Sequence, residues 1–110
     1  MSVKNNAITT MIRHGIHIPT EQLKAFCHTN GIRRLALFGS ILRDDFRPES
    51  DIDILVEFQE GVHVGLAFIR MQDELSNIFG RRVDLNTPAC LSKYFRDDVL
   101  HEVETLYVAA

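Results

Sequence analysis

The sequence has only two cysteines, Cys27 and Cys90, which lie far apart and form no Cys-x-x-Cys pair. This usage fits reduced thiols in a cytoplasmic protein better than a disulfide framework or a zinc site. No apolar run approaches the roughly 18 residues that span a membrane, and residues 1–17 lack the apolar centre of a signal peptide. Basic residues are in the minority, because 12 Lys and Arg stand against 15 Asp and Glu, for a net charge of -3. We therefore expect a soluble, cytoplasmic protein with no membrane partner and no general nucleic-acid binding.

The length of 110 residues predicts a single domain, and 45% hydrophobic with 25% charged residues is typical of an ordinary globular fold. Residues 1–18 are weakly patterned, so we interpret them as an N-terminal arm with at most a short helix, followed by one domain over residues 19–110. A domain of this size can bury one core but not a core plus a deep cleft closed by a lid domain. An enzyme of this size is expected to borrow part of its substrate site from a partner.

The hydrophobic pattern predicts alternating helices and strands. Helices are expected from Thr20, as N-cap, to Asn30-Gly31 and from Val64 to Phe79, and strands over 33–38, 51–58 and 82–86. Thr87-Pro88 is typical of a helix start, and the following apolar positions predict a C-terminal helix with a buried stripe of Leu91, Phe95, Val99, Val103 and Leu106. The order predicts an α/β fold, a small sheet with helices packed on it. Arg33-Arg34 and Arg81-Arg82 precede two of these strands and are interpreted as solvated strand ends.

Three aspartates are the strongest candidates for a chemical site. Asp51 and Asp53 are two residues apart on a predicted strand, so their side chains leave the same face with Cα atoms ~6.5 Å apart. Asp84 comes from the polar face of another strand. Three gathered carboxylates would repel one another unless a cation lay between them, and oxygen ligands of this kind suit Mg²⁺. On spacing alone, Asp51 and Asp53 could equally be the solvent-facing side of a half-exposed strand.

Gly39-Ser40 is the second candidate element, since it follows an apolar strand and precedes a short helical turn. A glycine lets the backbone approach a phosphate closely, and N–H groups at a helix start bind phosphate oxygens together with a serine hydroxyl. Arg43, one turn later, could reach the same phosphates. The alternatives are an ordinary strand-to-helix turn and a solvated arginine. A phosphate cradle beside a carboxylate pair would describe a nucleoside-triphosphate site.

The spacing of these motifs resembles a known family. Gly39-Ser40, ten intervening residues and then Asp51-Ile52-Asp53, with Asp84 on a later strand, is similar to the nucleotidyltransferase superfamily related to DNA polymerase β. The strings 37–43, 50–56 and 80–85, and the segment ending at Leu106-Tyr107, resemble its smallest branch, the minimal nucleotidyltransferases often found as antitoxins beside HEPN-domain toxins. The resemblance covers roughly residues 19–107 and implies the palm fold of that superfamily, an α+β fold with a small mixed sheet flanked by helices.

The resemblance also implies roles for these residues. Asp51, Asp53 and Asp84 would be catalytic residues and ligands of Mg²⁺, with two ions expected, and Asp84 would also be the base. Gly39 and Ser40, with Arg43, would hold the phosphates of ATP. The implied function is transfer of AMP from ATP to a HEPN-type toxin, which silences the toxin. Because larger relatives carry an additional helical domain, we expect the partner to complete the site.

Two other functions stay open at this stage. A binding-only antitoxin would neutralise its toxin by masking it, but such a protein has no use for three clustered carboxylates. A small-molecule nucleotidyltransferase would modify an antibiotic or a sugar, but it would need a second domain to form the acceptor pocket. The carboxylate trio therefore favours an enzyme that modifies a protein.

Overall fold

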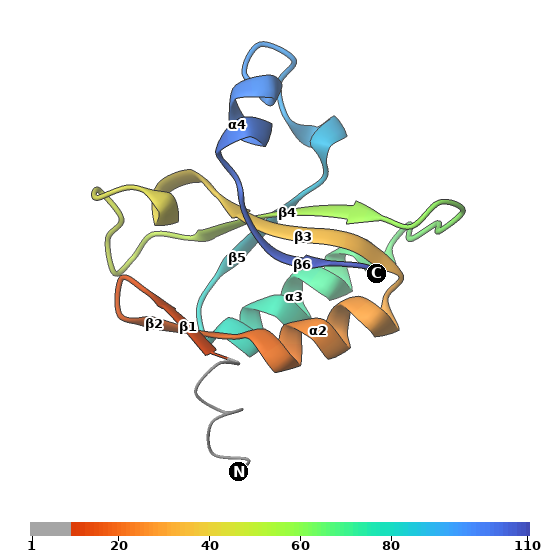
Figure 1. Cartoon of the computed structure of the whole chain (residues 1–110), viewed down its shortest axis with the longest axis horizontal. Helices are drawn as coiled ribbons and strands as arrows, with labels where there is room; N and C mark the ends of the chain where they lie inside the picture. Colours follow the sequence, from red (N-terminus) through yellow and green to blue (C-terminus); the bar gives the residue numbers. More distant parts are fainter. Residues whose placement is uncertain (1–9) are drawn as a thin grey trace.

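The fold is centred on a four-stranded mixed sheet, seen in a computed structural model that describes residues 10–110 (Figure 1). Its strands are β3 (Ile32–Phe38), β4 (Ile52–Phe58), β5 (Val83–Asn86) and β6 (Glu104–Val108), in the order β5-β4-β3-β6. β4 is antiparallel to β3 and parallel to β5, and β6 is antiparallel to β3. The predicted class, a small mixed sheet flanked by helices, is confirmed.

Two helices, α2 (Thr20–Thr29) and α3 (Ala67–Phe79), cover one face of the sheet (Figure 1). They pack apolar side chains against the inward residues of the strands, and this layer forms the hydrophobic core. Both helices end where the sequence predicts, α2 at Asn30 and α3 at Gly80, whose φ of 72° is the left-handed conformation that glycine adopts readily. α3 begins three residues later than predicted. Thr20 begins α2 but does not cap it, since its buried hydroxyl has no hydrogen-bond partner.

The expectation of a weakly structured N-terminal arm is wrong for residues 10–18. β1 (Thr10–Arg13) and β2 (Ile16–Pro19) form an antiparallel hairpin, and Ile18 is fully buried in the core. The turn consists of His14 and Gly15, both with positive φ, which suits a two-residue hairpin loop. The first nine residues lie outside the described part of the chain, and the boundary of the domain at residue 19 stays a prediction.

The predicted C-terminal helix is also wrong. Residues 87–108 instead form a short turn, η2 (Pro88–Cys90), a two-turn helix, α4 (Arg96–Glu102), and the edge strand β6. The apolar residues of the predicted stripe therefore serve different elements, and only Leu91 among them is buried. β6 forms because β3 offers a free backbone edge, with Tyr107 opposite Leu35. Among the described residues, no helix is long and apolar enough to cross a membrane.

Candidate active site

The register between β4 and β5 brings the three predicted aspartates to one face of the sheet. Asp53 of β4 lies directly opposite Asp84 of β5, and Asp51, two residues before Asp53, points to the same side. The intervening pair, Ile52 opposite Val83, is buried on the other face, under the helices. Alternation along two neighbouring strands thus gathers the carboxylates on the side of the sheet that α2 and α3 do not cover.

The Gly39-Ser40 turn lies directly on the Asp53 carboxylate. It begins η1 (Gly39–Leu42), a single helical turn between β3 and β4, and the residue before it, Phe38, is the cross-strand neighbour of Asp53. The backbone N–H of Ser40 lies close enough to the Asp53 carboxylate to lower its pKa. The predicted helical turn after the glycine is confirmed, and it lies against Asp53.

Gly39 is required at this turn for two separate reasons. Its φ of 79° is one that residues with a side chain rarely adopt. In addition, a Cβ atom there would lie 2.2 Å from Oδ2 of Asp53, which is far inside van der Waals contact. The space above Gly39 is therefore filled by the carboxylate itself, and the turn and the aspartate form one unit.

The site holds more negative charge than its surroundings compensate. The pKa of Asp53 rises from the usual 3.8 to about 6, chiefly because the group is half-buried, and further because Asp84 and Asp51 lie close. Arg43 and the Ser40 N–H lower this pKa but do not offset the burial. A divalent cation between the carboxylates would relieve this repulsion, so the donor chemistry of the site fits Mg²⁺.

The carboxylates share a face but are not arranged as a preformed metal cage. Among residues 10–110, no group of three His, Cys, Asp or Glu side chains is close enough together to hold a metal ion. One reason is that Asp51 binds Arg82, whose Nε lies 3.2 Å from Asp51 Oδ1. Mutual repulsion acts in the same direction, and a bound cation would have to compete with the arginine. Mg²⁺ ligation by Asp51, Asp53 and Asp84 stays a prediction.

Arg82 is a site residue that the sequence analysis missed. The interpretation of Arg81-Arg82 as solvated strand ends holds for Arg82, whose side chain is 80% exposed although it pairs with Asp51. Arg81 is half-buried instead, since it lies 5.1 Å from the Phe46 ring centre and donates to the Pro48 carbonyl. The signal was available: Arg82 is two residues before Asp84 and so leaves the same face of the chain.

The other basic residues selected from the sequence also form ion pairs. Arg33 and Arg34 were also interpreted as solvated strand ends. Arg33 is exposed as predicted, Arg34 is half-buried, and both bind Glu57. Arg43 is exposed, pairs with Asp45 at 3.5 Å, and acts on Asp53 through its charge. Its position one turn after Ser40 is compatible with the predicted contact to phosphates.

The segment after β5 forms the far wall of the site. Leu55 lies on the carboxylate face, two residues after Asp53, yet it is buried, and η2 lies against β4. Cys90 of η2 is close enough for the charge of Asp84 to act on it. Its pKa is lowered nevertheless, because Thr87 hydrogen-bonds the thiol.

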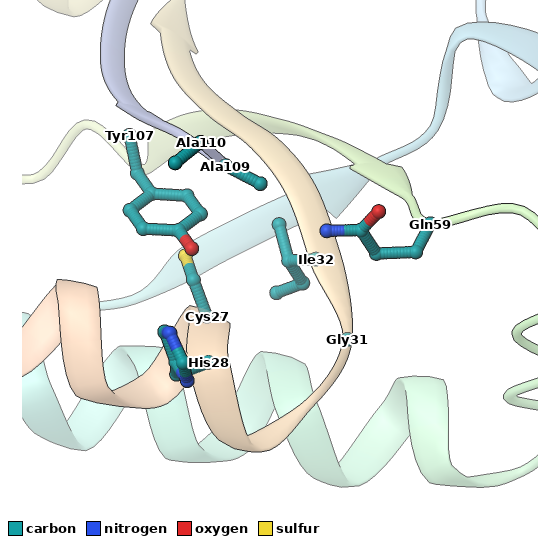
Figure 2. Close-up of a pocket in the computed structure, with 8 residues that line it drawn as sticks. All are labelled: Cys27, His28, Gly31, Ile32, Gln59, Tyr107, Ala109 and Ala110. Atoms are coloured by element: carbon teal, nitrogen blue, oxygen red, sulfur yellow. The ribbon is translucent and has the colours of Figure 1, made fainter.

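A cavity of about 220 Å³ lies away from the carboxylates (Figure 2). Cys27 of α2 and Tyr107 of β6 line it, next to Ile32, at the end of β3 opposite to Asp53. Burial raises the pKa of the Cys27 thiol to about 12, so it is not a nucleophile at neutral pH. This cavity therefore offers no activated thiol and lies apart from the carboxylate face.

Comparison with known proteins agrees with this site. Residues 20–105 match the nucleotidyltransferase domain family. The chain is 38% identical over 73 residues to protein adenylyltransferase MntA of Thermococcus cleftensis, covering 66% of this chain and 73% of that one. It is equally 38% identical over 73 residues to MJ0435 of Methanocaldococcus jannaschii, assigned as a protein adenylyltransferase, with 66% and 77% covered.

Solved structures share the fold. One assigned to the minimal nucleotidyltransferases superposes with a TM-score of 0.64 and 32% identity, covering 81% of this chain and 88% of that one. A toxin–antitoxin complex with AMP-PNP contains a chain with a TM-score of 0.66 and 20% identity, with 84% and 75% covered. The resemblance inferred from the Gly-Ser and Asp-x-Asp spacing is thus confirmed: the chain belongs to the nucleotidyltransferase family and is an enzyme of its minimal branch.

Proposed function

We propose that this protein transfers AMP from ATP to a side chain of a partner protein, and that the partner is a HEPN-type toxin which the transfer neutralises. The observation that carries the proposal is the unit formed by the Gly39-Ser40 turn and the Asp53 carboxylate, with Asp84 directly beside it. It combines a phosphate-binding backbone turn with clustered carboxylates, which are the two components that nucleotidyl transfer needs.

The names of related proteins support the same class of acceptor. Two relatives that are each 38% identical are called protein adenylyltransferases. Among structures with this fold are a complex of MntA with HepT and a complex of a tri-AMPylated HEPN toxin from Shewanella oneidensis with its MNT antitoxin. We extend this acceptor class to the present chain, acting in the cytoplasm.

Each residue of the site has a task in the proposed reaction. The backbone of Gly39 and Ser40, with Arg43, holds the β- and γ-phosphates. Asp51, Asp53 and Asp84 hold Mg²⁺, for which we expect two ions. Bound there, the metal would neutralise charge on the phosphates and polarise the α-phosphate.

The acceptor's hydroxyl oxygen forms a bond to the α-phosphorus while the bond from that phosphorus to pyrophosphate breaks. The hydroxyl proton passes to Asp84, which is exposed on the carboxylate face and so accessible to an incoming side chain. AMP ends on the acceptor, and pyrophosphate leaves.

The test is to incubate the protein with ATP, Mg²⁺ and a HEPN-type toxin, and to weigh the products by mass spectrometry. We expect the partner to gain AMP with the unchanged chain and with Asp73→Asn, a control carboxylate exposed on α3. Asp53→Asn should give no transfer. A partner that is neutralised without gaining mass would identify a binding-only antitoxin, and full transfer by Asp53→Asn would refute the site.

A further inference from the structure

The 92–102 segment, which comprises the loop after Leu91 and helix α4, exposes two aromatic side chains. Tyr94 is 86% exposed and Phe95 is 49% exposed, and α4 buries no side chain of its own. Large aromatics are expensive to keep in water, and they are enriched at the centres of protein interfaces. The aromatic pair directly before α4 therefore has no role in the core.

This segment stands on the same side of the sheet as the carboxylates. Figure 1 shows α4 on one side of the sheet and helices α2 and α3 on the other. The segment is joined to the site through η2, where the charge of Asp84 acts on Cys90, and through Leu91, which is buried on the carboxylate face. A molecule that touches Tyr94 therefore approaches the side of the sheet on which transfer would occur.

The charges around the aromatic pair indicate the chemistry of its partner. Asp97, Asp98 and Glu102 are exposed on α4, while Lys93 lies over the Tyr94 ring, 5.6 Å from its centre, and Arg96 turns back to donate to the Leu91 carbonyl. The segment thus carries three acidic side chains against two basic ones. In a two-fold contact between copies of this chain the same patch would face itself, so these acids would meet acids. The patch instead complements a protein surface that has an apolar recess with a basic rim.

We infer that Tyr94 and Phe95 are the anchors on which the acceptor protein docks, and that the acidic face of α4 meets basic side chains of that protein. The inference rests on the proposed function, because an acceptor hydroxyl can react only if its protein is held over Asp53 and Asp84. Docking on the 92–102 segment would hold it there without any additional domain in this chain.

A binding measurement between this protein and the HEPN-type toxin of the transfer assay tests the inference. The variant is Tyr94→Ala with Phe95→Ala. The matched control is Leu66→Ala with Ile69→Ala, because Leu66 is 86% and Ile69 is 60% exposed at α3, on the opposite side of the sheet. We expect the aromatic variant to bind the acceptor at least about 30-fold more weakly, the loss typical of one interface anchor, and the control to bind normally. Asp97→Asn with Asp98→Asn should slow association and reduce its dependence on salt.

Two further readouts separate the inference from its rivals. Affinity for AMP-PNP with Mg²⁺ should be the same in the aromatic variant and the unchanged chain, and a loss there would make the pair a base-stacking platform instead. Oligomeric state should also be unchanged, and a dimer lost with the aromatics would assign the patch to a second copy. If the unchanged chain transfers AMP and the aromatic variant does so with equal KM, the inference fails while the proposed function stands. If the unchanged chain transfers nothing, the proposed function fails.

Discussion

The two faces of the central sheet carry opposite kinds of residue, although the same strands supply both. On the helix-covered face, Ile52 and Ile54 of β4 are fully buried beside Val83 and Leu85 of β5. On the other face, Asp53 is half-buried and Asp84 is exposed. One face holds the fold together by burying apolar area, and the other gathers charges that repel each other.

The difference shows how a small domain can carry a site that opposes its own stability. Because side chains alternate along a strand, each aspartate is flanked by residues that anchor it in the core. The position of Asp53 is therefore set by Ile52 and Ile54, whatever its own charge costs. The buried residues of the helix-covered face thus fix the position of the carboxylates on the opposite face.

Substitutions of neighbouring residues on the two faces of β4 should have different effects: one should reduce AMP transfer and the other should reduce stability. Asp53→Asn should reduce AMP transfer by on the order of 10³-fold, because it removes a charge that holds the nucleotide's counter-ion. The folded protein should be as stable as before or more stable, since a repelling charge is lost. Transfer assays together with urea unfolding would measure both.

Ile54→Ala is the counterpart on the helix-covered face, one residue away. It should lower the free energy of unfolding by about 2–5 kcal/mol, because it leaves a cavity in the core. Molecules that remain folded should keep most of their transfer rate. If this variant were stable but inactive, the division of labour between the two faces would be wrong.

Nucleotide binding at the carboxylate face should stabilise the folded protein. Mg²⁺ with ATP should raise the free energy of unfolding by about 2.7 kcal/mol when the free ligand reaches 100 times its Kd. Mg²⁺ alone should do less, because phosphate oxygens are needed to complete its ligands. Thermal melts of the unchanged chain and of Asp53→Asn test this. An equal shift in both would exclude Asp53 from the site.

Gly39→Ala should disturb the point at which the turn meets the carboxylate face. The left-handed backbone alone costs roughly 1–2 kcal/mol with a side chain present, and the new Cβ would collide with Oδ2 of Asp53. The same substitution should cost less in an Asp53→Ala background, where that oxygen is absent. A double-mutant cycle of unfolding free energies measures the coupling, and strict additivity would contradict the contact.

The last comparison concerns the pH dependence of stability. The folded protein binds the Asp53 proton more tightly than the unfolded chain, since its pKa is about 6 rather than 3.8. The contribution of Asp53 to stability is therefore favourable at low pH and is lost as the pH rises from about 4 through 6. Asp53→Asn should gain stability relative to the unchanged chain over this window. A stability difference that is independent of pH would mean that Asp53 titrates normally.

The site could be predicted from the sequence because its information is local. The Gly-Ser turn ends an apolar strand, and the Asp-x-Asp pair occupies alternate positions of the next, so each pattern defines its own geometry. Asp84 could be added because it alternates with Val83 and Leu85. The sequence did not show that Asp53 would lie against Gly39, which depends on the antiparallel pairing of β3 with β4.

The ends of the chain could not be predicted in the same way. The apolar positions from Leu91 to Leu106 fit a helical period, yet Leu106 is in a strand and Phe95 is half-exposed. Residues 10–18 have a weak pattern, yet they form a hairpin that buries Ile18. In both segments the elements are short, so contacts with distant parts of the chain decide which structure they form.

The sequence by itself determined the two long strands and two long helices of the core and the family, since each is encoded by patterns within single segments of the chain. The tertiary structure alone decided that β6 completes the sheet, that Arg82 pairs with Asp51, and that Tyr94 is left exposed beside the carboxylate face. The physical reason is that these features join residues far apart in the chain. A free strand edge, a cross-strand ion pair and an uncovered side chain exist only once distant segments have packed together.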